Sequence, residues 1–178
     1  MNILDIIHEQ FEKAGIRHLV VGGCAVYAYG VDRNTDDVDI LIEDQAAQTA
    51  VMALSRYGYR EREQGHLVSR MIPNEPVLPI VDLMYVNTPT MEAMWQESRI
   101  VPLGAYAHHL PSPQHLINMK LHALRHGGEG RRNKDALDIL ELSRLHSIDM
   151  RSPDFEKACL HFGSPELYRF LMKLAGPT

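Results

Sequence analysis

The sequence is poor in cysteine, and the two it has are placed unfavourably for pairing or for metal binding. Cys24 and Cys159 lie far apart in the 178 residues, without a CxxC spacing. They supply neither an even framework of disulfides nor a cysteine-based metal motif. This pattern is typical of a reducing compartment, so we expect a cytoplasmic protein.

Long hydrophobic runs are also missing. No apolar run approaches the roughly 18 residues that a membrane-spanning helix needs. The amino end has no basic region, and Asp5, His8 and Glu9 interrupt it early, unlike a signal peptide. We therefore expect no membrane partner.

The chain has no excess of basic residues. It carries 18 Lys and Arg against 23 Asp and Glu, which gives a net charge of −5. No general surface for polyanions is predicted, and the acidity favours small or cationic substrates over long nucleic acid. With 45% hydrophobic and 23% charged residues, the chain can bury a sizeable core.

The hydrophobic pattern predicts an α/β fold, with a small mixed β-sheet flanked by helices and a helical segment at the carboxyl end. We expect two parts, residues 1–110 as the α/β core and residues 111–178 as a helical subdomain. Helices are predicted near 3–14, 24–29, 45–57, 88–97, 112–126, 133–146, 152–162 and 165–174. Strands are predicted at 18–21 and 37–42, and residues 59–87 are expected to form two or three strands, two of them at 67–72 and 79–86. A short extended piece is predicted at 98–103 and a flexible link at 127–130.

The most informative stretch is Gly22-Gly23 followed, after thirteen residues, by Asp37-Val38-Asp39. Residues two apart on a strand point to the same face, so Asp37 and Asp39 project together. Two adjacent carboxylates repel each other, and a divalent cation offsets that repulsion. Hard oxygen ligands suit Mg²⁺, so we predict Asp37 and Asp39 as metal ligands.

Asp82 is the candidate for a third acid. It lies in an otherwise apolar run, residues 79–85, that is typical of a core strand, where a lone carboxylate is costly without a partner. In a two-metal site Asp82 would bind the catalytic metal or accept the proton of the attacking hydroxyl.

The Gly22-Gly23 pair is the predicted phosphate-binding element. Glycine lets the backbone approach a phosphate closely, and a helix that follows it offers free N–H groups. Arg33 and Thr35, in the next loop, are candidates for further phosphate or hydroxyl contacts. An acidic pair alone commonly lies in a solvated loop, and a glycine pair after a strand often forms only a turn. The occurrence of both at this spacing favours a nucleotide-binding site.

Two later positions also attract attention. Lys120 lies on a mostly apolar helical stripe with Leu116, Ile117 and Leu124, where it needs an anionic partner or reaches water along its own stem. Asp135 begins another helix, where an acid is favourable even without a function.

Ten histidines raise the question of zinc. His122 and His126 are four apart but lack the Glu of HExxH, and His108-His109 has no Cys or acidic residue at ligand spacing. No zinc site is predicted from these spacings.

These residues resemble the DNA polymerase β-like nucleotidyltransferase superfamily, whose pattern is a Gly-Gly or Gly-Ser turn followed by two acids two residues apart. Within it, the chain is similar to the AbiEii/MenT-type toxin-related group. That likeness rests on three stretches, Arg33 to Asp39, Leu116 to Lys120, and Lys134 to Ile139.

The resemblance implies a nucleotidyltransferase core that moves a nucleoside monophosphate from an NTP to an acceptor hydroxyl, with Mg²⁺ and release of pyrophosphate. It makes Asp37 and Asp39 the metal ligands, Lys120 a triphosphate contact and Asp135 a further acid of the active site. Some relatives are toxins that modify the acceptor end of tRNA and are paired with an antitoxin protein. We therefore expect an RNA, tRNA or protein acceptor and an antitoxin partner.

Two alternatives stay open. One is an antibiotic nucleotidyltransferase of the aminoglycoside type, for which the negative charge suits a cationic small molecule. The other is a non-catalytic nucleotide-binding or antitoxin-like partner protein, against which the intact pair of Asp37 and Asp39 argues.

Overall fold

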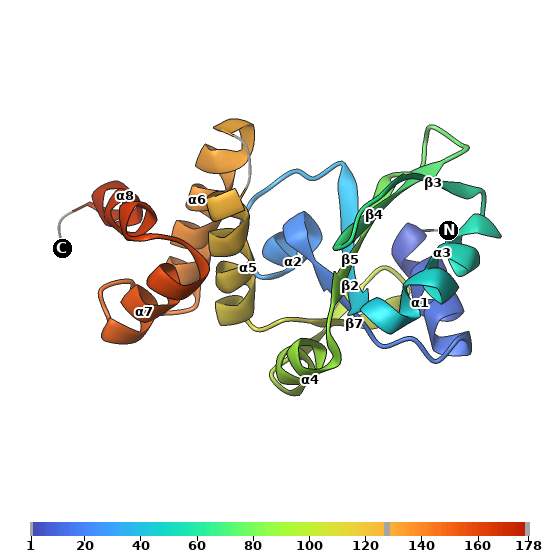
Figure 1. Cartoon of the computed structure of the whole chain (residues 1–178), viewed down its shortest axis with the longest axis horizontal. Helices are drawn as coiled ribbons and strands as arrows, with labels where there is room; N and C mark the ends of the chain where they lie inside the picture. Colours follow the sequence, from blue (N-terminus) through green and yellow to red (C-terminus); the bar gives the residue numbers. More distant parts are fainter. Residues whose placement is uncertain (1, 127–128, 177–178) are drawn as a thin grey trace. The chain divides into compact units, whose positions relative to one another are not determined.

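The computed structural model of the protein describes residues 2–126 and 129–176. It contains two compact units, the first made of Met1–Ala28 and Asp32–Ser112 and the second of Tyr29–Val31 and Pro113–Thr178 (Figure 1). Within the described residues, no helix has both the length and the apolar character to cross a membrane.

The first unit is built on a five-stranded mixed sheet with the strand order β1-β2-β5-β4-β3. β2 and β5 are parallel and the other neighbours are antiparallel, which confirms the predicted α/β fold with a small mixed sheet. The strands are β1 (His18–Val21), β2 (Asp37–Glu43), β3 (Tyr59–Gln64), β4 (Val68–Pro73) and β5 (Ile80–Val86). A separate antiparallel pair joins β6 (Arg99–Leu103) to β7 (Tyr106–Leu110).

Helices cover both faces of this sheet. Figure 1 shows α1 and α3 on one face and α2 on the other. Asn2 caps α1 by accepting a hydrogen bond from the Leu4 N–H, and Asn87 caps α4 in the same way through Thr90. The bounds are α1 (Ile3–Lys13), α2 (Gly22–Ala28), α3 (Ala47–Ser55) after a short 3₁₀ turn (Asp44–Ala46), and α4 (Thr88–Gln96).

The core of this unit lies between α1 and the central strands. Ile7 and Phe11, one turn apart on α1, are fully buried, as are Leu19 on β1, Ile40 on β2 and Leu83 on β5. Burial of these side chains fixes the central strands that carry the acidic residues.

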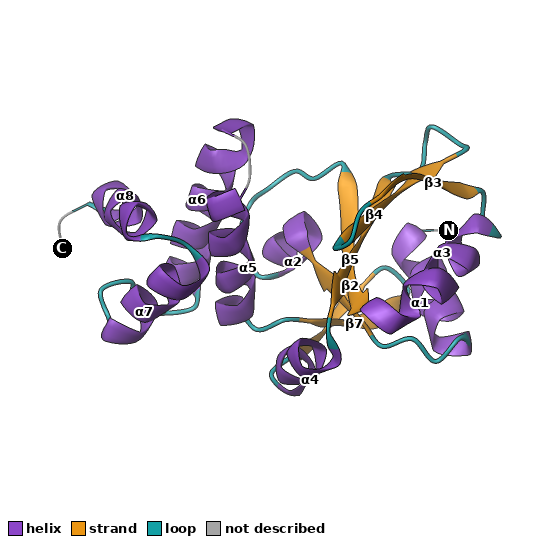
Figure 2. Cartoon of the chain, in the orientation of Figure 1, coloured by secondary structure: helices purple, strands orange, loops and turns teal. Residues whose placement is uncertain are grey.

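The second unit is helical, and the strands that Figure 2 colours orange all precede residue 111. Ser152 and Ser164, each followed by Pro, cap α7 and α8 through the backbone N–H three residues later. The helices are α5 (Pro113–His126), α6 (Glu129–Leu145), α7 (Pro153–Phe162) and α8 (Pro165–Ala175).

Two local predictions were wrong, and one strand was not predicted. α2 begins at Gly22 rather than Cys24, so the glycine pair forms the first residues of the helix instead of a turn before it. α6 includes Glu129 and Gly130, which were predicted as part of a flexible link; residues 127–128 lie outside the described residues. Strand β7 was not predicted, because its alternation is masked by two successive histidines.

The buried ring of Phe11 yields a stability prediction. Phe11→Ala should lower the free energy of unfolding by about 3–5 kcal/mol, because it removes a fully buried aromatic side chain and leaves a cavity. Leu67→Ala is the control, since Leu67 is 68% exposed and its loss should change stability by less than about 0.5 kcal/mol. Urea denaturation measures both, and equal losses would contradict this assignment of the core.

Candidate functional site

The strand register brings three acidic side chains to one place in the first unit. Asp37 and Asp39 are two apart on β2 and are half-buried, with the buried Val38 between them. In the pairing of the central strands, Asp39 lies opposite Val21 of β1 on one side and opposite Asp82 of β5 on the other. Two neighbouring parallel strands therefore place Asp82 beside the pair.

One carboxylate oxygen from each of Asp37, Asp39 and Asp82 lies within 4.8 Å of the others. Three carboxylates this close repel one another, and the repulsion is offset only by cations or hydrogen-bond donors. The donor set consists of hard oxygens at the end of a rigid strand pair, which is the ligand chemistry that Mg²⁺ prefers. The residues fit a divalent metal.

Gly22 packs directly against this cluster. A Cβ atom at position 22 would lie 1.7 Å from the Asp39 Oδ2 atom, and the residue has φ +59°, in the left-handed region that favours glycine. Gly23 is also confined, though less tightly, because a Cβ there would lie 2.5 Å from the Thr35 Oγ1 atom. The glycine pair thus leaves its backbone bare beside the carboxylates.

Thr35 ties the loop after α2 to the acidic pair. Its hydroxyl donates a 2.8 Å hydrogen bond to the Asp37 Oδ1 atom, which orients that carboxylate. Arg33 lies two residues earlier and is close enough to lower the pKa of Cys24 slightly, against larger opposing effects. Both loop residues predicted from the sequence are therefore near the cluster.

Arg70 is the residue that the sequence interpretation missed. On β4 it pairs in register with Asp82, and its guanidinium binds both carboxylate oxygens, with Nε at 2.9 Å from Oδ1 and an Nη at 2.8 Å from Oδ2. This hydrogen bonding raises the pKa of Arg70, which stays charged. The bidentate pair is the partner that a lone acid in a core strand requires. A charged residue in the otherwise largely apolar stretch 67–72 was the available signal.

The pKa of the Cys24 thiol reflects the negative charge of the site. Burial, followed by the charges of Asp39 and Asp37, raises the pKa of its thiol to about 11. The thiol therefore remains protonated near neutral pH and is not a nucleophile. The local field is one that attracts cations.

Lys120 and Asp135, the other two predicted site residues, lie together in the second unit. The Lys120 Nζ atom is 2.8 Å from the Asp135 Oδ1 atom and 2.6 Å from the Asp138 Oδ2 atom, and the lysine side chain is only 9% exposed. A buried lysine between two carboxylates on the next helix forms an ion-pair cluster in which each carboxylate offsets the cost of burying the charge. Their predicted contact with a nucleotide stays a prediction.

A family model described as "Uncharacterised nucleotidyltransferase" matches residues 1–176, nearly the whole chain. The chain belongs to this nucleotidyltransferase family. Membership supports a nucleotidyl-transfer enzyme and agrees with the superfamily predicted from the glycine pair and the two acids. No curated protein matches the sequence significantly.

Several solved structures share the fold of this nucleotidyltransferase. The solution structure of the antibiotic-resistance factor ANT(2'')-Ia has a TM-score of 0.64 at 13% identity, over 96% of both chains. The lincosamide antibiotic adenylyltransferase LnuA, lincomycin-bound, has 0.58 at 19% identity, over 80% of this chain and 95% of that one. An antigenic nucleotidyltransferase-like protein from Paracoccidioides brasiliensis has 0.59 at 17% identity, over 95% and 90%. At these identities the likeness concerns the fold.

The confinement of Gly22 predicts that a single methyl group disturbs the site. Gly22→Ala should displace the Asp39 carboxylate and strain the backbone, lowering nucleotidyl transfer by at least about tenfold and stability by about 1–3 kcal/mol. Transfer from labelled NTPs and urea denaturation measure the two effects.

Gly15→Ala is the matched control. Gly15 has a similar φ of +66° but no atom within 4 Å of its Cβ position, so this variant should carry only the backbone strain of about 1 kcal/mol and keep its activity. A Gly22→Ala protein as active as Gly15→Ala would show that the position of Asp39 is unimportant.

The ion-pair cluster of the second unit predicts a stability effect. Lys120→Met should lower the free energy of unfolding by about 3–5 kcal/mol, because it removes the buried cation that Asp135 and Asp138 share. Lys157→Met removes a lysine that is 76% exposed and pairs with Asp154, and should cost less than about 1 kcal/mol. Thermal or urea unfolding distinguishes them, and similar losses would argue against a buried cluster.

Proposed function

We propose that this nucleotidyltransferase moves a nucleoside monophosphate from an NTP to an acceptor hydroxyl, with Mg²⁺ as cofactor and pyrophosphate as the second product. The observation that carries the proposal is the approach of the Asp37, Asp39 and Asp82 oxygens to within 4.8 Å of one another. Its membership of a nucleotidyltransferase family supports the reaction class.

In this proposal Asp37 and Asp39 hold the metal and Asp82 is the third acid. When bound, Mg²⁺ would stabilise negative charge on the triphosphate and favour ionisation of the attacking hydroxyl. Thr35 holds Asp37 in place through its 2.8 Å hydrogen bond. Asp82, once Arg70 leaves it, offers two oxygens to a metal or to the proton of the acceptor hydroxyl.

The bonds that form and break in the proposed transfer suggest roles for the remaining residues. The acceptor oxygen forms a bond to the α-phosphorus, the bond from that phosphorus to the bridging oxygen breaks, and pyrophosphate leaves with the electron pair. The bare backbone at Gly22 and Gly23 is proposed to seat the phosphates, with Arg33 and Thr35 beside it. Lys120 and Asp135 are retained as a triphosphate contact and a further acid on the strength of the family resemblance alone.

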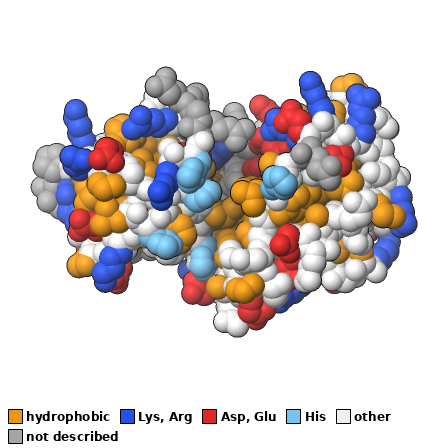
Figure 3. Space-filling model, viewed as in Figure 1, with side chains coloured by type: hydrophobic (Ala, Val, Ile, Leu, Met, Phe, Trp, Pro, Cys, Tyr) orange, Lys and Arg blue, Asp and Glu red, His pale blue; other side chains and the backbone are white. Residues whose placement is uncertain are grey.

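Two acceptors are proposed, in order of preference. The resemblance to the AbiEii/MenT-type group favours an RNA acceptor, the end of a tRNA first, and a role as the toxin of a toxin–antitoxin pair. A cationic antibiotic is the second candidate, favoured by the net charge of −5 and by the antibiotic adenylyltransferases among the structural neighbours. On the face that Figure 3 draws, Lys and Arg side chains lie among Asp and Glu side chains, which favours neither acceptor.

The acceptor test uses the full chain with each labelled NTP and Mg²⁺, in separate reactions with total cellular RNA, an aminoglycoside and a lincosamide. Label in a tRNA-sized band supports the toxin proposal, whereas a labelled antibiotic supports the second candidate. If Mg²⁺–NTP binding is itself absent, the protein is a non-catalytic partner and the proposed reaction is wrong.

Asp39→Ala is the sharpest test of the metal site. It should abolish at least about 99% of transfer, because loss of metal-based charge stabilisation raises the barrier by about 3 kcal/mol or more. The variant should remain folded, since it removes one of three repelling carboxylates. Asp44→Ala, at an exposed position just after β2, is the control and should keep full activity.

A further inference from the structure

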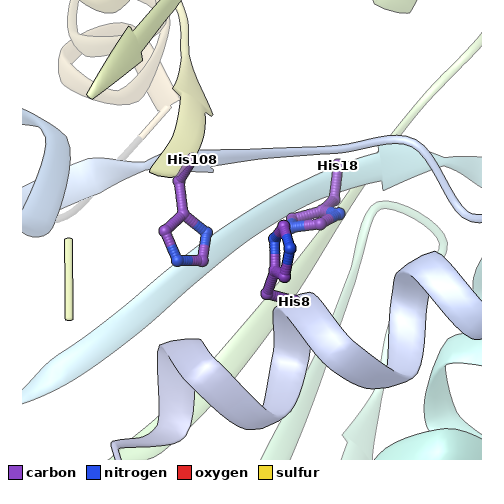
Figure 4. Close-up of side chains that lie close together, drawn as sticks. All are labelled: His8, His18 and His108. Atoms are coloured by element: carbon purple, nitrogen blue, oxygen red, sulfur yellow. The ribbon is translucent and has the colours of Figure 1, made fainter. Parts of the chain in front are cut away.

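Three histidines that are distant in the sequence meet in the first unit, away from the carboxylate cluster. His8 lies on α1, His18 begins β1 and His108 lies on β7, and Figure 4 shows His8 projecting from its helix toward the two histidines on strands. The ring centroid of His8 is 5.4 Å from that of His108 and 6.4 Å from that of His18. The centroids of His18 and His108 are 6.2 Å apart. Since His18 is three residues along β1 from Val21, which pairs with Asp39, the cluster lies about 10 Å along the strand from the acidic site.

The buried ring of His108 lacks a well-aligned hydrogen bond. Its side chain is 1% exposed, and within the described part of the chain neither ring nitrogen makes a hydrogen bond of good geometry, although the Leu103 backbone is near enough to raise its pKa against larger opposing effects. Buried polar groups in folded proteins are nearly always satisfied, so such a ring calls for a partner, which can be water, a ligand or an ion. The ring belongs to the same group as His8 and His18, which points to a shared ligand.

His18 presents a lone pair toward the cluster. Its Nδ1 atom lies 3.3 Å from the Ile16 carbonyl oxygen, which only accepts, so Nδ1 carries the proton and Nε2 does not. An N–H bound to a backbone carbonyl is the arrangement that orients metal-binding histidines. Burial lowers the pKa of both His18 and His108 to about 4, which keeps both rings neutral near pH 7.

The third ring is held but accessible. His8 is half-buried and stacks on Tyr106, with ring centroids 4.3 Å apart, and the Tyr106 hydroxyl donates to the Glu9 carboxylate at 3.0 Å. Asp5, on the same helix, accepts a hydrogen bond from the Ala105 N–H and lies close enough to His108 to influence it electrostatically. Two carboxylates near the cluster partly balance a bound cation.

We propose that His8, His18 and His108 bind one divalent transition-metal ion, with Zn²⁺ as the first candidate. One nitrogen from each ring lies within 4.8 Å of the others, whereas Zn–N bonds of about 2.0–2.1 Å at tetrahedral angles place them about 3.4 Å apart. Reaching that spacing requires the half-buried His8 ring to turn and the His18 and His108 rings, whose centroids are 6.2 Å apart, to move closer together. Imidazole ligands suit Zn²⁺, Co²⁺, Ni²⁺ and Cu²⁺, and do not suit Mg²⁺, so the two sites select different ions.

The ion would join α1 to β1 and β7, and three protein ligands leave its fourth position to water. Because an ion that binds only the folded chain shifts the folding equilibrium, free Zn²⁺ at 100 times its Kd should favour the native state by about 100-fold. This site would act on stability, independently of the nucleotidyl transfer proposed above.

The test is titration of the full chain with Co²⁺, whose tetrahedral nitrogen-rich complexes absorb visible light strongly. With excess Mg²⁺ present to compete for the carboxylate cluster, we expect one equivalent of Co²⁺ bound in the wild type and displaced by Zn²⁺. His8→Gln should weaken binding by more than about 100-fold, since loss of a direct ligand exceeds the 10–100-fold effect of losing an outer one. His66→Gln, at an exposed position, should bind as the wild type does.

A second measurement requires no variant. X-ray absorption on the Zn²⁺-loaded wild type should give three imidazole nitrogens at about 2.0–2.1 Å. The proposal is overturned if the wild type binds no Zn²⁺, if His8→Gln binds it as tightly as His66→Gln, or if binding is lost in Asp39→Ala and competed by Mg²⁺. The last result would place the ion on the carboxylates.

Discussion

The mutual repulsion of three carboxylates at the centre of one sheet is the constraint on which the rest of the site depends. Asp37, Asp39 and Asp82 are brought together by strand pairing that cannot relax without breaking the core. Thr35 and Arg70 supply the neighbouring donors that the structure describes for Asp37 and Asp82. The arrangement holds negative charge in place where a divalent ion and a triphosphate would need it.

Much of this arrangement could be predicted because its signals are local. The period of two along β2 places Asp37 and Asp39 on one face, and the apolar context of Asp82 indicates a buried strand. The roles of these residues in binding metal and nucleotide stay predictions. Arg70 could not be assigned, because its pairing with Asp82 depends on the register between β4 and β5, which the sequence does not state.

The histidine cluster could not be predicted from the sequence either, because it depends on contacts between distant segments. His8 and His108 are separated by a hundred residues, and nothing in their spacing resembles a metal motif. They meet because β7 lies next to β1 and α1 contacts β7, while the rings of His8 and Phe11 on α1 lie against His18 of β1. For Lys120, in contrast, the need for an anionic partner could be predicted from its apolar surroundings. The structure supplies Asp135 and Asp138 of α6 as partners within the helical unit.

The bidentate pairing of Arg70 with Asp82 means that both oxygens of this carboxylate become available to a ligand together or not at all. Both oxygens of that carboxylate are engaged by one planar group, so a single rotation of the guanidinium releases both together. The charge of Asp82 is thereby balanced by a cation that the chain itself supplies. This pairing lowers the repulsion that the sheet has to overcome when it folds without an ion from solution.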